Sequence, residues 1–171
     1  DNSYDGFKLK RLLIDEAGKI EEADFNKMFN ITKTCCLVGG KLIGKMIIGS
    51  TVNESSKGGK PFQDVWNLSN PLEKNENGRT ASGLYRYFVP AYDGLEGFVD
   101  EYGNSVIEDP TTKVLDRDGI VIKQGAKSYL TKERNGKRKV GDIVGFYEQM
   151  RQFPFDEDEM FRDAANEKTT F

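Results

Sequence analysis

The chain has 171 residues, of which 31% are charged and 37% hydrophobic. This length is typical of one domain, or of one domain with a small appendage, and eleven Phe and seven Tyr supply large side chains for a core. The formal net charge of −3 gives no overall basic character that would favour nucleic-acid binding. The absence of His excludes Ser-His-Asp and Cys-His catalysis and His-ligated zinc.

The two cysteines, Cys35 and Cys36, are adjacent in the chain. Neighbouring cysteines rarely form a disulfide, and two thiolates do not complete a structural zinc site, so we expect both to be buried in a reducing compartment. The most apolar stretch, residues 35–49, contains two lysines and is shorter than the roughly 20 residues of a membrane span. No signal-peptide pattern begins the chain. We therefore expect a soluble intracellular protein without a membrane partner.

The first third of the chain predicts a parallel sheet. The unalternating apolar run at residues 12–14 is typical of a strand buried on both faces. Residues 20–30 carry apolar side chains at helical spacing, and residues 42–48 form a second apolar run. Strand, helix and strand within so few residues predict a βαβ unit with parallel strands.

The middle of the chain is rich in Asn, Ser, Gly and Lys, which predicts loops over most of residues 52–83. Within it, residues 62–68 contain apolar side chains that favour one helical turn or a short strand. Residues 84–89 are aromatic and β-branched and predict a third strand, which Pro90 ends. Residues 98–107 predict a small hairpin or loop.

The last third of the chain predicts helices. Residues 121–134 and 140–153 have amphipathic patterns, and Asn135-Gly136 between them predicts the turn of an αα-hairpin. Asp156, followed three residues later by Glu159, predicts a short capped helix over residues 156–164.

Two acids, Asp15 and Glu16, directly follow the first predicted strand. Ligands of parallel sheets bind at the carboxyl ends of the strands, and two acids at that position form the Walker B arrangement of phosphate-hydrolysing motors. Asp15 would face the Mg²⁺ of a nucleotide, because hard cations prefer oxygen ligands. Glu16 would orient or deprotonate the attacking water. The same residues are equally consistent with a core strand that ends in two solvated acids.

A polar turn, Gly49-Ser50-Thr51, ends the second predicted strand at the same edge of the sheet. Hydroxyl groups there are suited to sense a γ-phosphate, although Ser and Thr also open ordinary loops. A P-loop is missing: five Gly-Lys pairs occur, and none is followed by Ser or Thr. The chain thus has the acids of a nucleotide hydrolase without the phosphate clamp, which is typical of a fragment.

Four segments together are similar to the large terminase subunit of tailed bacteriophages, the ATP-driven motor that pumps double-stranded DNA into the procapsid. They occur in the expected order along nearly the whole chain. The most specific is the closing pattern Arg-x-x-Pro-Phe-x-x-x-Glu-x-Phe. The segments are residues 11–18 (Arg-Leu-Leu-Ile-Asp-Glu-Ala-Gly), 47–51 (Ile-Ile-Gly-Ser-Thr), 82–91 (Ser-Gly-Leu-Tyr-Arg-Tyr-Phe-Val-Pro-Ala) and 151–161.

The resemblance implies an α/β fold with part of a P-loop NTPase-type parallel sheet, from the Walker B strand onward, and a helical lid subdomain. Residues 1–52 would hold the Walker B and coupling segments, 53–109 a variable loop with a further strand and hairpin, and 110–171 the helical lid and linker that lead toward a nuclease domain. Asp15 would be the Mg²⁺ ligand and Glu16 the catalytic carboxylate. The coupling motif between hydrolysis and movement would be Gly49, Ser50 and Thr51.

The same resemblance implies ATP and Mg²⁺ as cofactors. The implied partners are double-stranded DNA, the portal protein, the small terminase subunit and other copies of the large subunit. The implied location is the procapsid vertex in the cytoplasm of the infected bacterial host. ATP hydrolysis is expected of the complete protein, whereas this chain, without a P-loop or a nuclease domain, is expected to be inactive alone.

Two groups of basic residues are weaker candidates. A cluster near the predicted helical turn would contact DNA phosphates or another subunit, or would be a solvated helix end. Arg79 and Arg86 would serve as arginine fingers for a neighbouring subunit, although nothing local distinguishes them from other arginines. The cluster consists of Lys132, Arg134, Lys137, Arg138 and Lys139.

Two other functions are consistent with the sequence. The chain would be a non-catalytic lid or scaffold module that docks on DNA, on a portal or on a partner subunit. Alternatively, it would be a standalone α/β domain whose acids are surface charges. Mg²⁺-ATP binding by the chain distinguishes these readings, because the missing clamp predicts weak binding.

Overall fold

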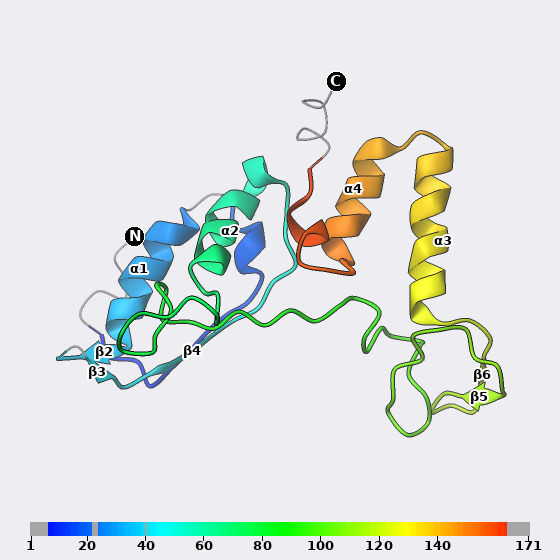
Figure 1. Cartoon of the computed structure of the whole chain (residues 1–171), viewed down its shortest axis with the longest axis horizontal. Helices are drawn as coiled ribbons and strands as arrows, with labels where there is room; N and C mark the ends of the chain where they lie inside the picture. Colours follow the sequence, from blue (N-terminus) through cyan, green and yellow to red (C-terminus); the bar gives the residue numbers. More distant parts are fainter. Residues whose placement is uncertain (1–6, 22–23, 40, 164–171) are drawn as a thin grey trace. The chain divides into compact units, whose positions relative to one another are not determined.

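The computed structural model describes residues 7–21, 24–39 and 41–163 (Figure 1). The chain divides into two compact units, unit 1 at residues 1–87 and unit 2 at residues 88–171. Both helices and short strands are present, so the fold is mixed α/β, with sheets of two strands each in the described part.

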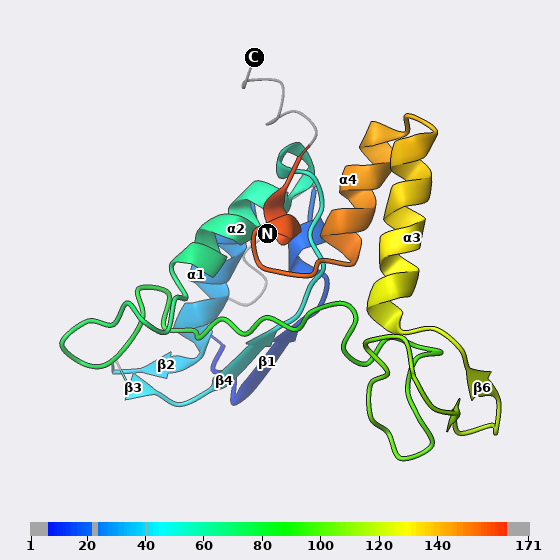
Figure 2. The same ribbon diagram turned by 45° about the vertical axis from the view of Figure 1, so that its right-hand side comes forward.

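A parallel pair of strands organises unit 1. Strand β1 (Arg11–Ile14) pairs with β4 (Lys45–Ile48), and helix α1 (Phe25–Cys35) lies between them in the chain. This confirms the predicted βαβ unit with parallel strands. The hydrogen-bonded register places Leu13 opposite Ile47. In both ribbon views, α1 and α2 (Gly59–Asn67) lie on the same side of this pair (Figures 1 and 2).

The prediction of strands buried on both faces is wrong. Exposed and half-buried residues alternate along β1 and β4, and Leu13 and Ile47 are 72% and 66% exposed. The helices of unit 1 cover one face of the pair, and the other face is open. An apolar run alone cannot distinguish a strand that is covered on one face from a strand that is covered on both, because burial of the second face requires helices or another sheet to pack there.

Helix α1 begins later than predicted, at residue 25 rather than 20. The Asp24 carboxylate accepts a hydrogen bond from the backbone N–H of Lys27 at 3.3 Å and caps the helix. Residues before it form a short 3₁₀ turn, η1 (Ala17–Lys19). Cys35 ends α1, and both cysteines are buried and free of disulfides, as expected.

A short antiparallel hairpin of β2 (Leu37–Val38) and β3 (Lys41–Leu42) precedes β4 and was not predicted. It takes up the first residue of the apolar run at 42–48. The chain then turns through Gly44, whose Cβ would lie 2.2 Å from the Leu9 carbonyl oxygen. Only Lys45–Ile48 therefore pair with β1.

The core of unit 1 is aromatic. Phe25 packs against Phe29 and Phe62, with ring centroids 6.3 and 6.0 Å apart. Phe62 comes from α2, which follows the 3₁₀ turn η2 (Ser55–Lys57). The segment predicted as one helical turn or a short strand is thus a full helix, because Phe62 and Val65 share its buried face.

The third strand predicted at residues 84–89 is not formed. Within the described residues these six join no ladder, although the backbone N–H of Arg86 donates to the Ser69 carbonyl at 2.9 Å. Tyr85 and Tyr87 are exposed. Strand composition favours an extended chain, but a ladder also requires a neighbouring strand edge.

Unit 2 begins with loops and small hairpins. A bridge between Val99 and Ser105 closes the hairpin predicted at residues 98–107. Strands β5 (Val114–Leu115) and β6 (Val121–Ile122) form another hairpin. The predicted helix at residues 121–134 therefore begins later, as α3 (Ala126–Lys139).

The αα-hairpin of α3 and α4 (Ile143–Gln152) is confirmed, with its turn displaced from the predicted position. Asn135 and Gly136 lie inside α3. The chain reverses at Gly141, which has φ of 78°, a conformation that favours glycine. The Asp142 carboxylate then caps α4 by accepting a hydrogen bond from the backbone N–H of Gly145 at 3.0 Å.

The predicted helix at residues 156–164 is a single 3₁₀ turn, η3 (Glu159–Phe161). The predicted acid does cap it, because Asp156 accepts a hydrogen bond from the backbone N–H of Glu159 at 2.9 Å. The segment extends only to this turn because Arg162 is already in the extended conformation. Residue 164 lies outside the described residues.

Candidate functional site

The two acids and the polar turn lie at one edge of the parallel pair. Asp15 follows β1, and Gly49 follows β4, its neighbour in the sheet. The backbone N–H of Gly49 donates to the Ile14 carbonyl at 2.9 Å, and the N–H of Ala17 donates to the Gly49 carbonyl at 3.3 Å. A Cβ on Gly49 would lie 3.7 Å from Asp15 Oδ1. The first carboxylate therefore lies against the glycine of the polar turn.

The backbone of Glu16 is strained. Its φ of 54° and ψ of 36° are left-handed, and it is the one non-glycine residue with positive φ in the described part of the chain. This conformation costs roughly 1–2 kcal/mol in an L-residue, and such strain is concentrated at functional sites. The Asp15 carboxylate supports it by accepting a hydrogen bond from the Glu16 N–H at 3.0 Å.

The Glu16 carboxylate is paired with a cation that the sequence analysis missed. Lys19 Nζ lies 3.1 Å from Glu16 Oε2, and both side chains are partly exposed. An exposed pair of this kind stabilises the fold little. Its consequence is local: it ties the Glu16 side chain to Lys19, the last residue of the 3₁₀ turn. The three-residue spacing of the two charges was a signal that could have identified it.

Ser50 joins the acidic turn to the polar turn. Its Oγ accepts a hydrogen bond from the backbone N–H of Gly18 at 2.8 Å and donates one to the Thr51 carbonyl. The Asn53 N–H donates to the Gly18 carbonyl at 3.2 Å. Gly18 is buried, and a Cβ there would lie 2.8 Å from the Thr51 carbonyl oxygen. The close approach of two chain segments thus requires glycine, which was also missed.

This edge offers oxygen ligands for a hard cation. The donors are the carboxylates of Asp15 and Glu16 and the hydroxyl of Ser50. Across the described residues, no group of three or more His, Cys, Asp or Glu side chains could enclose a metal. Mg²⁺ commonly uses one or two carboxylates and keeps waters or substrate phosphates as its other ligands. The donors at this edge therefore do not form a complete protein cage for a metal among the described residues.

The predicted basic cluster divides into buried and exposed members. Arg134 is 7% exposed, and it binds Glu159 through two hydrogen bonds of 3.0 and 2.9 Å. Its guanidinium also lies 3.7 Å from the centre of the Phe155 ring. Arg134 is thus a buried structural residue of unit 2, which removes it from the surface proposed to contact DNA.

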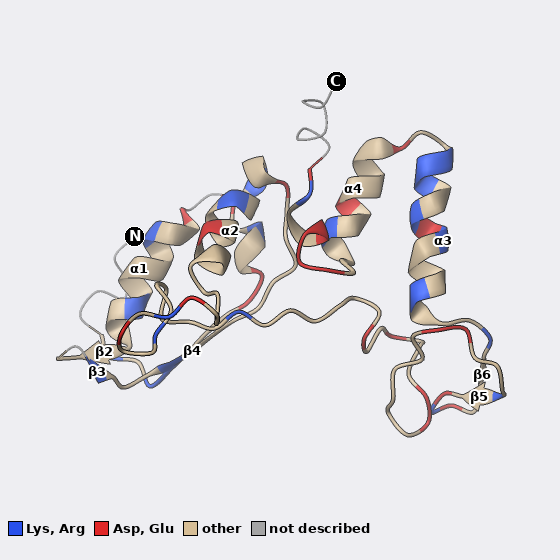
Figure 3. Ribbon diagram, in the orientation of Figure 1, with Lys and Arg blue, Asp and Glu red and all other residues tan. Residues whose placement is uncertain are grey.

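The other four residues of that cluster lie between the middle and the end of α3, a helix on which Figure 3 shows several basic positions. Lys132 and Lys139 are exposed. Lys137 Nζ is 3.9 Å from Asp142 Oδ2, and Arg138 lies 5.7 Å from the ring centre of Phe146. The end of α3 therefore presents a basic surface whose charges are only partly compensated.

The two candidate arginine fingers occupy different environments in unit 1. Arg79 is exposed in a turn, where its backbone N–H donates to Asn75 Oδ1 at 3.1 Å. Arg86 is half-buried, with its guanidinium 5.9 Å from the centre of the Trp66 indole ring. Arg79 has the exposure that contact with a neighbouring subunit would require.

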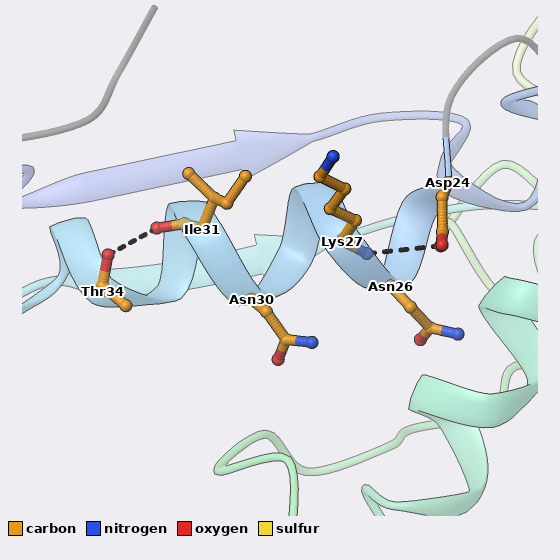
Figure 4. A pocket seen from close by; sticks show the side chains of 6 residues that line it. All are labelled: Asp24, Asn26, Lys27, Asn30, Ile31 and Thr34. Carbon is orange, nitrogen blue, oxygen red and sulfur yellow. Dashed lines mark hydrogen bonds between the residues drawn. The ribbon is translucent and has the colours of Figure 1, made fainter. Parts of the chain in front are cut away.

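A shallow concave surface lies along one side of α1 (Figure 4). Its polar atoms are used locally: the Lys27 N–H donates to Asp24, and the Thr34 hydroxyl donates to the Ile31 carbonyl at 2.7 Å. None of its residues is a candidate from the sequence analysis. They are Asp24, Asn26, Lys27, Asn30, Ile31 and Thr34.

No protein-family model, no curated protein and no solved structure matches this chain. In the part of the chain that the structure describes, none of the helices combines the length and apolar character needed to cross a membrane.

Proposed function

We propose that this chain is part of a DNA-packaging ATPase that resembles the large terminase subunit of tailed bacteriophages. The observation that supports this best is that Asp15 and Glu16 follow β1 and Ser50 follows β4, so the acids and the polar turn leave the carboxyl ends of two adjacent parallel strands. Nucleotide sites of α/β proteins occupy that position. The strained backbone of Glu16 adds support, because such strain is concentrated at active sites and ligand-binding sites.

In the proposed motor, β1 and β4 belong to a larger P-loop NTPase-type sheet, and a P-loop outside residues 1–171 clamps the triphosphate. The helices of unit 2 would form the lid. The motor would work at the procapsid vertex in the host cytoplasm. Its partners would be double-stranded DNA, the portal protein, the small subunit and further copies of the large subunit.

The chemistry assigns different roles to the two acids. Asp15 would hold the Mg²⁺ of ATP, and this ion would supply charge neutralisation at the phosphates. Glu16 would orient the attacking water and accept its proton. Lys19, which is paired with Glu16, would have to release this carboxylate before it contacts the attacking water. Ser50 would pass a change at this edge to the turn at residues 50–53, because its hydroxyl contacts both segments.

Mutation of Glu16 tests the assignment in the complete motor. Glu16→Gln keeps the size of the side chain and removes the base, so DNA-dependent ATP turnover should fall by at least roughly 10²-fold. Glu76→Gln is the matched control, because Glu76 is an exposed acid in a turn of the same unit. Near-normal turnover by Glu16→Gln would refute the assignment.

The chain itself permits a direct metal test. Mn²⁺ can replace Mg²⁺ at oxygen sites, and as a paramagnetic ion it broadens the NMR signals of nearby nuclei. The amides of Glu16 and Gly49 should broaden first, and Asp15→Asn should abolish the effect.

Mg²⁺-ATP should bind weakly to this chain in calorimetry, because the phosphate clamp is missing. Tight binding would contradict the proposal that the acids lie in this chain and the phosphate clamp lies outside residues 1–171.

A second candidate function is a binding module without catalysis. The observation in its favour is the basic surface at the end of α3, where Lys132 and Lys139 are exposed. If this surface binds duplex DNA, affinity should fall steeply with salt, and Lys139→Ala should reduce the salt dependence by about one charge. Unchanged binding in Lys139→Ala would exclude this surface as the DNA contact.

A further inference from the structure

The parallel pair in unit 1 has an uncovered face with a distinctive composition. Side chains alternate along each strand, and the register places Arg11 opposite Lys45 and Leu13 opposite Ile47 on the same outer face. We call these four residues the open face. The helices of unit 1 lie on the other side of the strands (Figures 1 and 2). Parallel strands are normally covered on both faces, whereas no second layer covers this face among the described residues of unit 1.

The charges on the open face indicate what covers it. Arg11 and Lys45 are directly opposed, and like charges in that position repel one another. Within the described residues, neither forms an ion pair with an acid. A carboxylate between them would relieve the repulsion. The two aliphatic side chains next to them, 72% and 66% exposed, require an apolar cover.

We propose that the open face binds an amphipathic helix that carries carboxylates beside a stripe of aliphatic residues. Residues two apart on a strand are separated by about 6.6 Å, and four residues of a helix rise about 6 Å. A helix along the strands would therefore place an aliphatic residue on Leu13 and Ile47 and an acid one turn away on Arg11 and Lys45. Nucleic acid is a poorer fit, because phosphates gain nothing from the aliphatic pair.

Two synthetic peptides test the proposal on the intact chain. Both form amphipathic helices with the same leucine stripe, one flanked by glutamates and the other by lysines. Fluorescence anisotropy should show binding of the glutamate peptide at least about fivefold tighter than that of the lysine peptide. The difference should shrink as salt rises, and NMR shifts should concentrate at residues 11–14 and 45–48.

Charge reversal supplies the second arm. The double variant Arg11→Glu, Lys45→Glu should prefer the lysine peptide, and its far-UV spectrum should be unchanged because both residues are exposed. Reversal of two exposed lysines of unit 2 that belong to no candidate site, Lys113→Glu with Lys123→Glu, is the matched control and should leave the preference unchanged.

Three results would overturn the proposal. The first is equal binding of the two peptides by the unmodified chain. The second is displacement of the glutamate peptide by short duplex DNA, if that displacement is lost in the Arg11→Glu, Lys45→Glu variant. The third is sedimentation of the chain as a dimer that Leu13→Asn dissociates, which would assign the open face to a second copy. None of these outcomes bears on the nucleotide site, because the peptides probe binding and not hydrolysis.

Discussion

Gly18 donates its backbone N–H to Ser50 Oγ at 2.8 Å, and this bond joins the turn that carries the acids to the turn that ends β4. The two residues are 32 positions apart in the chain. The carbonyl of Gly18 is also used, by the backbone N–H of Asn53. The acidic turn is therefore fixed through both backbone polar groups of one residue, Gly18.

Replacement of Ser50 should loosen this junction. Ser50→Ala leaves the Gly18 N–H without its acceptor, which should lower the free energy of unfolding by about 1 kcal/mol. Hydrogen exchange of the Gly18 amide should accelerate. Ser56→Ala, at an exposed position of the same unit, is the control and should change neither quantity. Unchanged exchange at Gly18 in the Ser50→Ala chain would show that the bond is absent in solution.

A methyl group at Gly18 should be poorly tolerated. Its Cβ would lie 2.8 Å from the Thr51 carbonyl oxygen and 3.3 Å from Phe62 Cδ1, so Gly18→Ala should destabilise by roughly 1–3 kcal/mol in urea unfolding. Gly136→Ala is the opposite case, because Gly136 lies in α3 with open space around it. That variant should stabilise by about 0.5–1 kcal/mol. Equal effects of the two substitutions would contradict the packing described.

The left-handed backbone of Glu16 predicts a contrast between two neutral replacements. Asn tolerates this conformation, whereas a β-branched residue does not. Both Glu16→Asn and Glu16→Val remove the pair with Lys19, so their difference isolates the backbone. The Asn variant should be more stable by at least about 1 kcal/mol in urea unfolding. Equal stabilities would indicate that residue 16 adopts an ordinary conformation in solution.

Loss of the Arg134 guanidinium should weaken unit 2. Arg134→Met leaves the Glu159 carboxylate, 14% exposed, without its cationic partner, and should cost about 3–5 kcal/mol of stability. Arg134→Lys should rank between this variant and the unmodified chain, because lysine keeps the charge and loses the bidentate geometry. Lys132→Met, at an exposed position of the same helix, should be nearly neutral. A small effect of Arg134→Met would mean that the pair is solvated.

Asp109 should make the stability of unit 2 depend on pH in the acidic range. The pKa of Asp109 lies below its ordinary value, chiefly because the carboxylate accepts a hydrogen bond from the backbone N–H of Gly125. A hydrogen bond from the Ser128 side chain lowers the pKa further. A depressed pKa in the folded state stabilises the fold above the pKa of the unfolded chain. That contribution is lost as the pH falls from about 4 through the folded pKa. Asp109→Asn should therefore flatten the decline of the urea midpoint between neutral and acidic pH. An unchanged slope would contradict the assignment.

Local patterns of the sequence were sufficient for several elements. The parallel pair, the αα-hairpin and the burial of both cysteines follow from apolar runs and helical spacing, which are properties of neighbouring residues. The common edge of Asp15 and Ser50 was predictable too, because carboxyl ends of adjacent parallel strands coincide. The roles of these residues in hydrolysis remain a prediction.

Other features depended on partners distant in the chain. Residues 84–89 have the composition of a strand and form none, because a ladder needs an available edge. Arg134 belongs to a basic run, yet Glu159 and Phe155 bury it. Gly18 ends the segment at residues 11–18, but nothing in that pattern shows that the Thr51 carbonyl approaches it and leaves no room for a side chain.

The amino-acid sequence by itself determined the parallel pair with its intervening helix, the αα-hairpin and the two acids that end one strand, since periodicity and turn residues act over a few positions. The tertiary structure alone decided that the helices of unit 1 pack on one face of the parallel pair and that Ser50 holds Gly18, 32 positions away in the chain. These are contacts between separate segments, whose energies depend on distance in space and not on distance along the chain.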